Sequence, residues 1–298
     1  PHHFMLSYLK ALPIILTVAL VTFWLAGLAF PAARARGEIH HARLVFLLVT
    51  IAAFASPNIW SYAVMLAVIV FVSQMKHELQ AGHGAVLWAG LAVAVPNVGV
   101  YLPGAVGIGT FLEVTHLRVL TLALVPSLIA GMTYGQRCPR PLGLATDWFV
   151  FIFFLLQLGL IVPNVSMTVL LREGVVLAVD TLMPYWLFSR AVASIGEFTQ
   201  AVRAFVVTML VMCAVAAFEA VLHWPLYDSV SAAWGVQWDM SVFIIRGGLL
   251  RAKAAAGFSL MLGFALVVAL GLWLIVRREV VRPGMVVLGD LSLAVGLV

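Results

Sequence analysis

The sequence predicts an all-α fold, a polytopic transmembrane helical bundle. Hydrophobic residues make up 64% of the 298 residues, charged residues only 10%, and the mean hydropathy is +1.11. A soluble domain cannot cover its surface with so few polar side chains. Since a bilayer core of about 30 Å takes roughly 20 apolar residues per helix, the apolar runs predict about 9–10 membrane segments. We therefore expect a single integral membrane domain over residues 1–298.

Apolar runs mark the expected segments in order, and Pro57 and Pro184 predict how the chain bends at two places among them. Proline lacks a backbone donor and restricts the residue before it, so Ser56-Pro57-Asn58 predicts either a tight hairpin or one kinked helix. Pro184 is expected to kink its helix and to free the carbonyl of Asp180. The expected segments are residues 11–30, 44–56, 59–73, 85–101, 119–134, 148–163, 174–189, 203–222, 254–276 and 284–298.

The two ends of the chain predict a fragment. The chain begins at Pro1 without a methionine, and its last apolar run stops at Val298 while still short for a membrane segment. We expect a truncation at the C-terminus, and a truncation at the N-terminus is an open alternative.

The basic residues predict the orientation of the segments, because short cytoplasmic loops are enriched in Lys and Arg. If alternate loops are placed inside, those loops hold most of the basic residues, namely Arg34, Arg36, Arg43, Lys76, Arg137, Arg140, Arg190, Arg203, Arg277, Arg278 and Arg282. The outer side then holds Lys10, Arg118, Arg172, Arg246, Arg251 and Lys253. Half of these outer residues crowd into the last outer loop, which breaks the rule and needs a reason.

That last outer loop contains the candidate anion site. Arg246, Arg251 and Lys253 supply charge and hydrogen-bond donors that suit phosphate, while Gly247 and Gly248 let the backbone approach an anion closely. We interpret the loop as a phosphate or pyrophosphate site at the outer membrane face. Interfacial anchoring to lipid head groups is the alternative.

Aromatic residues precede this loop and could bind sugar. Trp224 and Tyr227 could stack on sugar rings while nearby carboxylates bond the hydroxyls, and an aromatic belt at the membrane surface is the alternative. The same segment also holds Trp234, Trp238, Asp228 and Asp239.

Ionisable residues inside apolar runs predict either a polar cavity or buried pairing, because a charge in the bilayer core is costly. Asp180 and Glu219 are the candidates of this kind. Other charged residues lie near outer helix ends, where they either line the same cavity or form local salt bridges; these are Arg172, Glu173, Glu113, His116 and Arg118.

Several other functions are disfavoured by the sequence. The net charge of +5 is spread between apolar runs, so membrane lipids with anionic head groups are expected partners and nucleic acid is not. Cys138 and Cys213 show no CxxC spacing, and no metal or cofactor motif is present. The GAVGIG segment at 104–109 lacks the order of a dinucleotide-binding motif and indicates a flexible loop.

An ordered series of segments resembles the O-antigen ligase and polymerase superfamily of bacterial membrane glycosyltransferases. The segments are HLRVLTLALVPSL at 116–128, VDTLMPYWLFSR at 179–190, AFEAVLHWPLY at 217–227 and RGGLLRAKAAAGFSLMLG at 246–263. Each is of low specificity, and their order carries the resemblance.

The resemblance implies an inner-membrane, multi-pass enzyme of surface polysaccharide or lipopolysaccharide biosynthesis. Its donor would be an undecaprenyl-pyrophosphate-linked glycan and its acceptor a glycan or lipid, with transfer or polymerisation at the periplasmic face and no cofactor. Outer-loop arginines would hold the pyrophosphate, which fits Arg246 and Arg251, and Arg246 with Gly257 matches the Arg-x10-Gly spacing of polymerase loops. The family's histidine-bearing outer loop would lie beyond Val298, so the catalytic residues stay unknown.

Two other classes of function stay open. Asp180, Glu219 and the proline-interrupted helix also suit a membrane transporter or lipid-linked glycan flippase, although the sequence shows no convincing internal repeat. A non-enzymatic assembly subunit is the third alternative.

Overall fold

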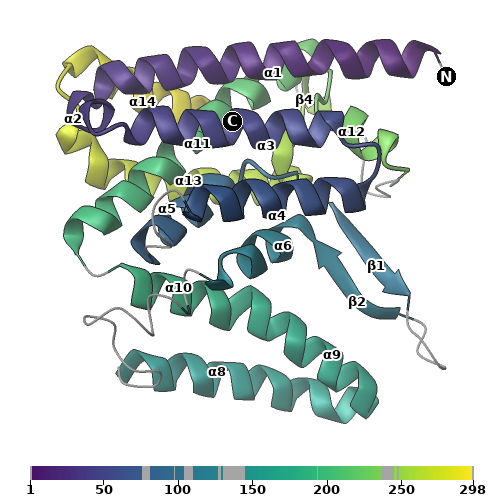
Figure 1. Cartoon of the computed structure of the whole chain (residues 1–298). Helices are drawn as coiled ribbons and strands as arrows, with labels where there is room; N and C mark the ends of the chain where they lie inside the picture. The colour runs from purple at the N-terminus through teal and green to yellow at the C-terminus, as the bar shows by residue number, and fades with distance from the viewer. Residues whose placement is uncertain are drawn as a thin grey trace. The chain divides into compact units, whose positions relative to one another are not determined.

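The computed structural model describes residues 2–75, 81–96, 98–103, 110–126, 129, 145–192, 194–235, 245–246 and 248–296. The chain divides into two compact units, which are treated separately below (Figure 1). Unit 1 contains Pro1–Ile69, Ala89–Val98 and Thr199–Val298, and unit 2 contains Val70–Trp88 and Gly99–Phe198.

Four helices in the described part of the chain are long and apolar enough to cross a membrane. These stretches are Lys10–Ala29, Glu38–Ala55, Ile195–Leu222 and Ser259–Glu279. Shorter apolar helices cover Ile59–Met75, Ala145–Ile161 and Pro283–Gly296. The helices indicate a membrane protein and confirm the mainly helical class, while the predicted number of 9–10 segments stays a prediction.

Unit 1 consists mostly of long helices. They are α1 (His2–Ala29), the short α2 (Pro31–Ala35), α3 (Glu38–Ala55), α4 (Ile59–Met75, as far as Ile69), α11 (Ile195–Leu222, from Thr199), α12 (Asp228–Ala233), α13 (Ser259–Val276) and α14 (Pro283–Gly296). A two-stranded hairpin of β3 (Ile245–Arg246) and β4 (Leu249–Leu250) lies between α12 and α13. The core includes Phe23 of α1 packed on Phe46 of α3, with ring centroids 5.6 Å apart.

The break at Pro57 forms a hairpin, as one of the two alternatives predicted. Helix α3 ends at Ala55, and Ser56 takes an extended conformation before α4 begins at Ile59. Ser56 Oγ lies 3.4 Å from Met65 Sδ, which shows that the chain turns back (Figure 1). Trp234, which follows α12, covers this turn by donating to Ser56 O at 3.0 Å and stacking on Tyr62.

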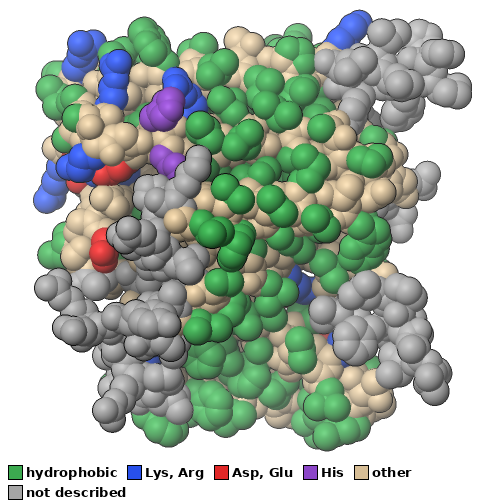
Figure 2. Space-filling model, in the orientation of Figure 1, with side chains coloured by type: hydrophobic (Ala, Val, Ile, Leu, Met, Phe, Trp, Pro, Cys, Tyr) green, Lys and Arg blue, Asp and Glu red, His purple; other side chains and the backbone are tan. Residues whose placement is uncertain are grey.

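A network around Arg203 joins three loops at one end of unit 1. The Arg203 guanidinium donates to Glu38, at the start of α3, and to Glu279 at 2.5 Å, just after α13. Glu38 also accepts from Arg36 at 2.5 Å and from Gln200 at 3.1 Å. Charged and histidine side chains gather over this α2 end of the unit, whereas hydrophobic ones spread over the adjoining face (Figure 2). The sequence predicts that these residues share the cytoplasmic side; the contact shows that they lie together, and the side itself stays a prediction.

Helices α13 and α14 approach closely because Gly289 has no side chain. A Cβ at Gly289 would lie 2.4 Å from the ring of Trp273, which is 1% exposed. Trp273 Nε1 donates to Asp290 Oδ1 at 2.6 Å, so this carboxylate in an apolar helix is hydrogen-bonded. Seven residues further along α14, Gly296 packs in the same way against Cys213 of α11.

Unit 2 contains a β-hairpin and several shorter helices. Its elements are part of α5 (Ala81–Leu91), β1 (Gly99–Pro103), β2 (Thr110–Thr115), α6 (His116–Ala123), α8 (Ala145–Ile161), a 3-10 turn (Val162–Asn164), α9 (Met167–Leu177), a π-helical turn (Ala178–Leu182) and α10 (Met183–Ala191). Antiparallel β1 and β2 pair Tyr101 with Glu113. The loop between them, with the GAVGIG segment, lies outside the described residues.

Several predicted segments differ from the structure in their bounds, among them 203–222, which begins at Ile195, and 119–134, where the described helix ends at Ala123 and most of the rest lies outside the described residues. The prediction of a helix over 85–101 is wrong beyond Leu91, because the chain turns before Pro96 and enters β1 at Gly99. Proline cannot supply the N–H that a helix needs, and the β-branched and aromatic residues that follow it suit a strand. The helix predicted over 174–189 starts earlier, at Met167, and continues through the π-helical turn into α10.

The π-helical turn lies just before Pro184, where a kink was predicted. Met183 N donates to Ala178 O, five residues back, in place of the usual four. A wider turn accommodates the missing proline N–H without ending the helix. This turn carries Asp180.

We expect Gly289→Ala to destabilise the protein by about 1–3 kcal/mol, because the added methyl group overpacks the α13–α14 contact. Gly271→Ala is the matched control, since a Cβ at this α13 position meets nothing within 4 Å and alanine favours a helix. Thermal unfolding of both variants in detergent measures the difference. Equal midpoints would show that the close approach at Gly289 is unimportant.

Candidate functional site

Glu219 organises the first candidate site, at the end of α11 in unit 1. Its carboxylate is 1% exposed and accepts three backbone hydrogen bonds. The donors are Leu226 N at 2.9 Å, Lys253 N at 3.1 Å and Ala254 N at 2.9 Å. Glu219 therefore joins the loop after α11 to the segment before α13. The sequence predicts either a polar cavity or buried pairing at Glu219. The structure shows pairing, with backbone N–H groups rather than with a cation.

Lys253 forms an ion pair within the same site. Its ammonium lies 3.0 Å and 2.9 Å from the two carboxylate oxygens of Asp228, at the start of α12. The Lys253 side chain is mostly buried, so most of its charge is already compensated by the protein. Lys253 is therefore less available to a ligand than the exposed Arg251.

The β3–β4 hairpin supports the two arginines of the loop. Gly248 has φ = +82°, a conformation that glycine adopts easily, and its carbonyl oxygen lies 2.9 Å from His223 Nε2. Arg246 belongs to β3 and pairs with Leu249, while its side chain and Gly247 lie outside the described residues. Arg251 follows β4 and is exposed, with no hydrogen bond or ion pair to the described part of the chain.

The predicted aromatic residues pack on the protein rather than forming one open platform. Tyr227 is buried against Phe54, with ring centroids 6.1 Å apart, and burial together with the Glu219 carboxylate raises the pKa of Tyr227. Trp224 is half-buried beside Phe218 at 6.3 Å. Trp224 is thus the more accessible of the two predicted sugar-binding residues. Trp238 and Asp239 lie outside the described residues.

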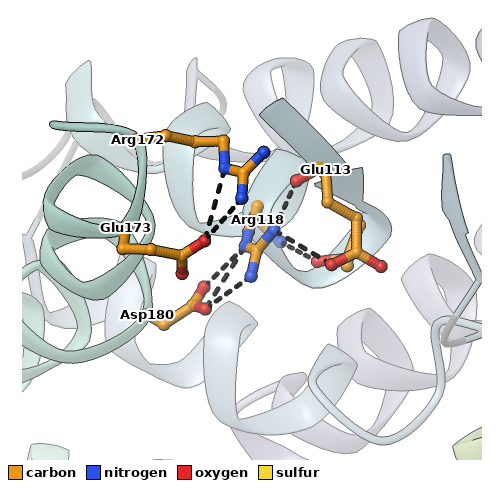
Figure 3. Close-up of polar contacts among 6 residues, drawn as sticks. Glu113, Arg118, Arg172, Glu173 and Asp180 are labelled. Carbon is orange, nitrogen blue, oxygen red and sulfur yellow. Dashed lines mark hydrogen bonds and ion pairs between the residues drawn. The ribbon is translucent and has the colours of Figure 1, made fainter. Parts of the chain in front are cut away.

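A second charged cluster lies in unit 2 and is centred on Arg118 (Figure 3). Arg118 Nε donates to Asp180 Oδ1 at 3.0 Å, and its Nη2 donates to Asp180 Oδ2 at 2.8 Å. Its Nη1 donates to the carbonyl of Glu113 and lies 3.7 Å from the Glu113 carboxylate. The hydrogen bond to Asp180 raises the pKa of Arg118, and nearby Glu113 and Glu173 add to this effect.

Local structure explains how this second cluster forms. Strand β2 runs directly into α6, whose first turn is capped by the Thr115 side chain accepting from Arg118 N at 3.3 Å. Gly99 on β1 leaves room for Glu113, because a Cβ there would lie 2.6 Å from the Glu113 carboxylate. Arg172 and Glu173 on α9 pair with each other at 3.1 Å.

The predicted residues thus fall into two sites that are described separately. Arg251, Lys253, Glu219, Trp224 and Tyr227 lie in unit 1 with the backbone of Arg246, and Arg172 and Asp180 lie in unit 2. For the charged residues of unit 2 the sequence predicts either a shared cavity or local salt bridges, and the structure shows salt bridges. Arg118, which the sequence placed only near a helix end, is the central residue there.

Sequence reasoning missed a fully buried ion pair in unit 2. Arg190 donates to both oxygens of Asp147, at 2.8 Å and 2.6 Å, and the two side chains are 1% and 0% exposed. The Tyr185 hydroxyl also donates to Asp147 at 2.5 Å. Arg190 was interpreted as a loop cation that marks the cytoplasmic side. A clue was available in Asp147, a lone acid at the start of an apolar run.

Across the residues that the structure describes, no group of three or more His, Cys, Asp or Glu side chains could hold a metal ion. Comparison of the chain with known protein families, curated proteins and solved structures gives no significant match. The apolar helices are therefore the evidence that this is a membrane protein, and no match identifies its activity.

We expect Asp147→Ala to destabilise the protein by about 3–5 kcal/mol, because it leaves Arg190 buried without its partner. Asp180→Ala removes a similar two-point contact with an arginine, but Asp180 is 40% exposed and solvent screens the pair. Its cost should be about 1 kcal/mol or less. Chemical unfolding of the two variants gives the comparison, and equal costs would refute the role of burial.

We also expect Glu219→Gln to loosen the segment before α13, because an amide cannot accept three backbone hydrogen bonds as a carboxylate does. The expected destabilisation is about 3 kcal/mol. Hydrogen–deuterium exchange of residues 251–256 should quicken in this variant. Asp228→Asn, which weakens only the partly exposed pair with Lys253, is the control and should leave that exchange nearly unchanged; equal exchange in both variants would contradict the assignment.

Proposed function

We propose that the protein is a membrane glycosyltransferase of the O-antigen ligase and polymerase type, acting on a lipid-pyrophosphate-linked glycan at the periplasmic face of a bacterial inner membrane. The observation that carries the proposal is the arrangement around Glu219. A buried carboxylate fixes the backbone of the loop that holds Arg251 and Lys253, next to the hairpin that holds Arg246. Exposed Arg251 has no described partner, so its charge is available to an anion.

The proposed chemistry is an inverting transfer. An acceptor hydroxyl attacks the anomeric carbon of the donor sugar, and the bond from that carbon to the pyrophosphate oxygen breaks. The pyrophosphate leaves with the electron pair, and arginine side chains stabilise the charge that develops on it. Arg251 and Arg246 would supply this stabilisation, and Lys253 would contribute less because Asp228 already pairs with it. The base that accepts the hydroxyl proton is not assigned.

The aromatic residues support the same proposal to different degrees. Trp224 keeps part of its ring accessible near the Glu219 end of α11, which suits contact with a sugar face. Tyr227 is buried and packs on Phe54, which suits a supporting role for the loop. Trp224 is therefore the better candidate for direct contact with a sugar.

A transporter or lipid-linked glycan flippase is the second candidate, and the π-helical turn favours it. Asp180 lies on this turn, one helical turn before Pro184, and pairs with Arg118. Wide turns and interrupted helices recur at transport and other functional sites. An ion pair at such a place can open and close as a helix moves, and the Arg118 cluster would then serve translocation.

We expect Arg251→Ala, made in the complete encoded protein within the bacterium that carries it, to lower glycan transfer by about 10²–10³-fold, because a leaving-group contact is lost. Gel ladders of the surface glycan and the amount of membrane-inserted protein are the measurements. Lys10→Ala, which removes another exposed basic residue on the predicted outer side, is the control.

Unchanged ladders in Arg251→Ala would refute the proposed role of this residue. If purified protein in liposomes moves a lipid-linked glycan across the bilayer without transferring it, the flippase is correct and the glycosyltransferase is not.

A further inference from the structure

An apolar groove lies in unit 1. It is formed by α1, α11, α13 and α14 and has a volume of about 550 Å³. On α1 it extends from Thr17 to Phe30, and on α14 from Met285 to Val295. Trp273 and Cys213 line it and are nearly buried, whereas Leu291 and Val295 are 57% and 62% exposed at its rim. The groove is therefore open to the surface that lipid would cover.

The groove has the length of one lipid chain. Thirteen residues separate Thr17 from Phe30, and at 1.5 Å per residue they span about 20 Å. Half of a hydrocarbon core of about 30 Å is about 15 Å, so the groove extends over roughly one leaflet. Its lining is overwhelmingly apolar, with threonine and serine as its few polar side chains. These features suit an acyl chain.

The α13–α14 loop, which carries several arginines, lies near the end of the groove at Phe30. Val281 N donates to Ala29 O at 3.4 Å, which places the α13–α14 loop at this end. Arg34 follows Phe30 by one helical turn, but its aliphatic carbons lie against Gly27, on the face of α1 that contacts Ile39 of α3 rather than on the groove face. Arg282 comes three residues before Met285, which lines the groove.

The charge at this end is not neutralised by the protein. Both nearby carboxylates are engaged, Glu38 by Arg36 and Arg203 and Glu279 by Arg203. Across the described ranges, four further arginines there are exposed and have no carboxylate partner, namely Arg34, Arg277, Arg278 and Arg282. An apolar groove that ends at unpaired cations matches a molecule with an apolar chain and an anionic head.

We propose that this groove is a binding site for an anionic phospholipid, with one acyl chain lying between α1 and α14 and the phosphate at Arg282, within the positive charge that Arg34, Arg277 and Arg278 add to this end. The proposal does not depend on sugar transfer: the phosphate end of the site lies beside Arg203, whose guanidinium is 5.6 Å from the Phe30 ring centroid, while the apolar groove continues along α11 to Ala217, two residues before Glu219. The positive charge favours an anionic lipid over a zwitterionic one. The length of one leaflet favours an acyl chain over a polyprenyl chain that is much longer.

The test uses the whole purified chain in detergent with an equimolar mixture of phosphatidylglycerol and phosphatidylcholine that carry the same acyl chains. Native mass spectrometry counts the lipid of each kind that the protein retains. The wild-type protein should prefer phosphatidylglycerol. Replacing Arg34 or Arg282 by alanine should weaken that preference about fivefold for each residue removed. Lys10→Ala, which removes an exposed cation on α1 far from Phe30, should keep the preference.

A second variant tests the groove itself. Ala214 of α11 lines the groove, and Ala214→Phe should reduce the number of retained phosphatidylglycerol molecules by one. If this variant does not fold, the arginine variants still decide the question, since their side chains lie outside the core. Equal retention of both lipids, or an unchanged preference after both arginines are replaced, would overturn the proposal. Stronger retention of a polyprenyl phosphate, or a dimer that excludes lipid, would also overturn it.

Discussion

Helix α11 carries one buried charged side chain near each end, and the packing of unit 1 depends on how these charges are compensated. At one end Arg203 is held between Glu38 and Glu279, and at the other Glu219 accepts three backbone hydrogen bonds. Sixteen residues separate Arg203 from Glu219, a distance of about 24 Å along the helix. In a low-dielectric surrounding an uncompensated charge costs free energy. Folds in which neighbouring loops supply partners to Arg203 and Glu219 are therefore favoured.

This constraint gives the two ends of α11 different properties. Around Arg203 the compensation is ionic and joins side chains from three loops, with further arginines left over. Around Glu219 the compensation comes from main-chain groups, so the carboxylate shapes the backbone on which other side chains stand. The first end attracts anions through surplus charge, and the second presents a small number of cations on a fixed loop.

The helices were largely predictable because hydropathy averages over many residues, as in α3, α11 and α13. The β1–β2 hairpin was not, since apolar residues such as Val98 and Tyr101 raise hydropathy equally in a strand and in a helix, and Pro96 was the available warning. For the sites, the sequence showed which side chains are costly to bury but not their partners. Asp147 and Arg190 are 43 residues apart, and no local pattern joins them. The pairing of Lys253 with Asp228 could likewise not be separated from an anion-binding role.

The π-helical turn at Ala178–Leu182 sets the helical phase of everything that follows it in α10. Each residue of a regular helix advances the side-chain direction by about 100°. A π-helical turn absorbs one extra residue. The angle between the side-chain directions of Asp180 and Arg190 is therefore that of a regular helix with one residue fewer between them. This offset lets Asp180 reach Arg118 while Arg190 reaches Asp147. A deletion of one residue within the turn would restore a regular helix and leave Arg190 facing its partner, whereas a deletion in α10 before Arg190 would rotate that side chain by about 100° away from Asp147. The turn is therefore the one place in this segment where the chain can lose a residue and still keep the ion pair between Arg190 and Asp147.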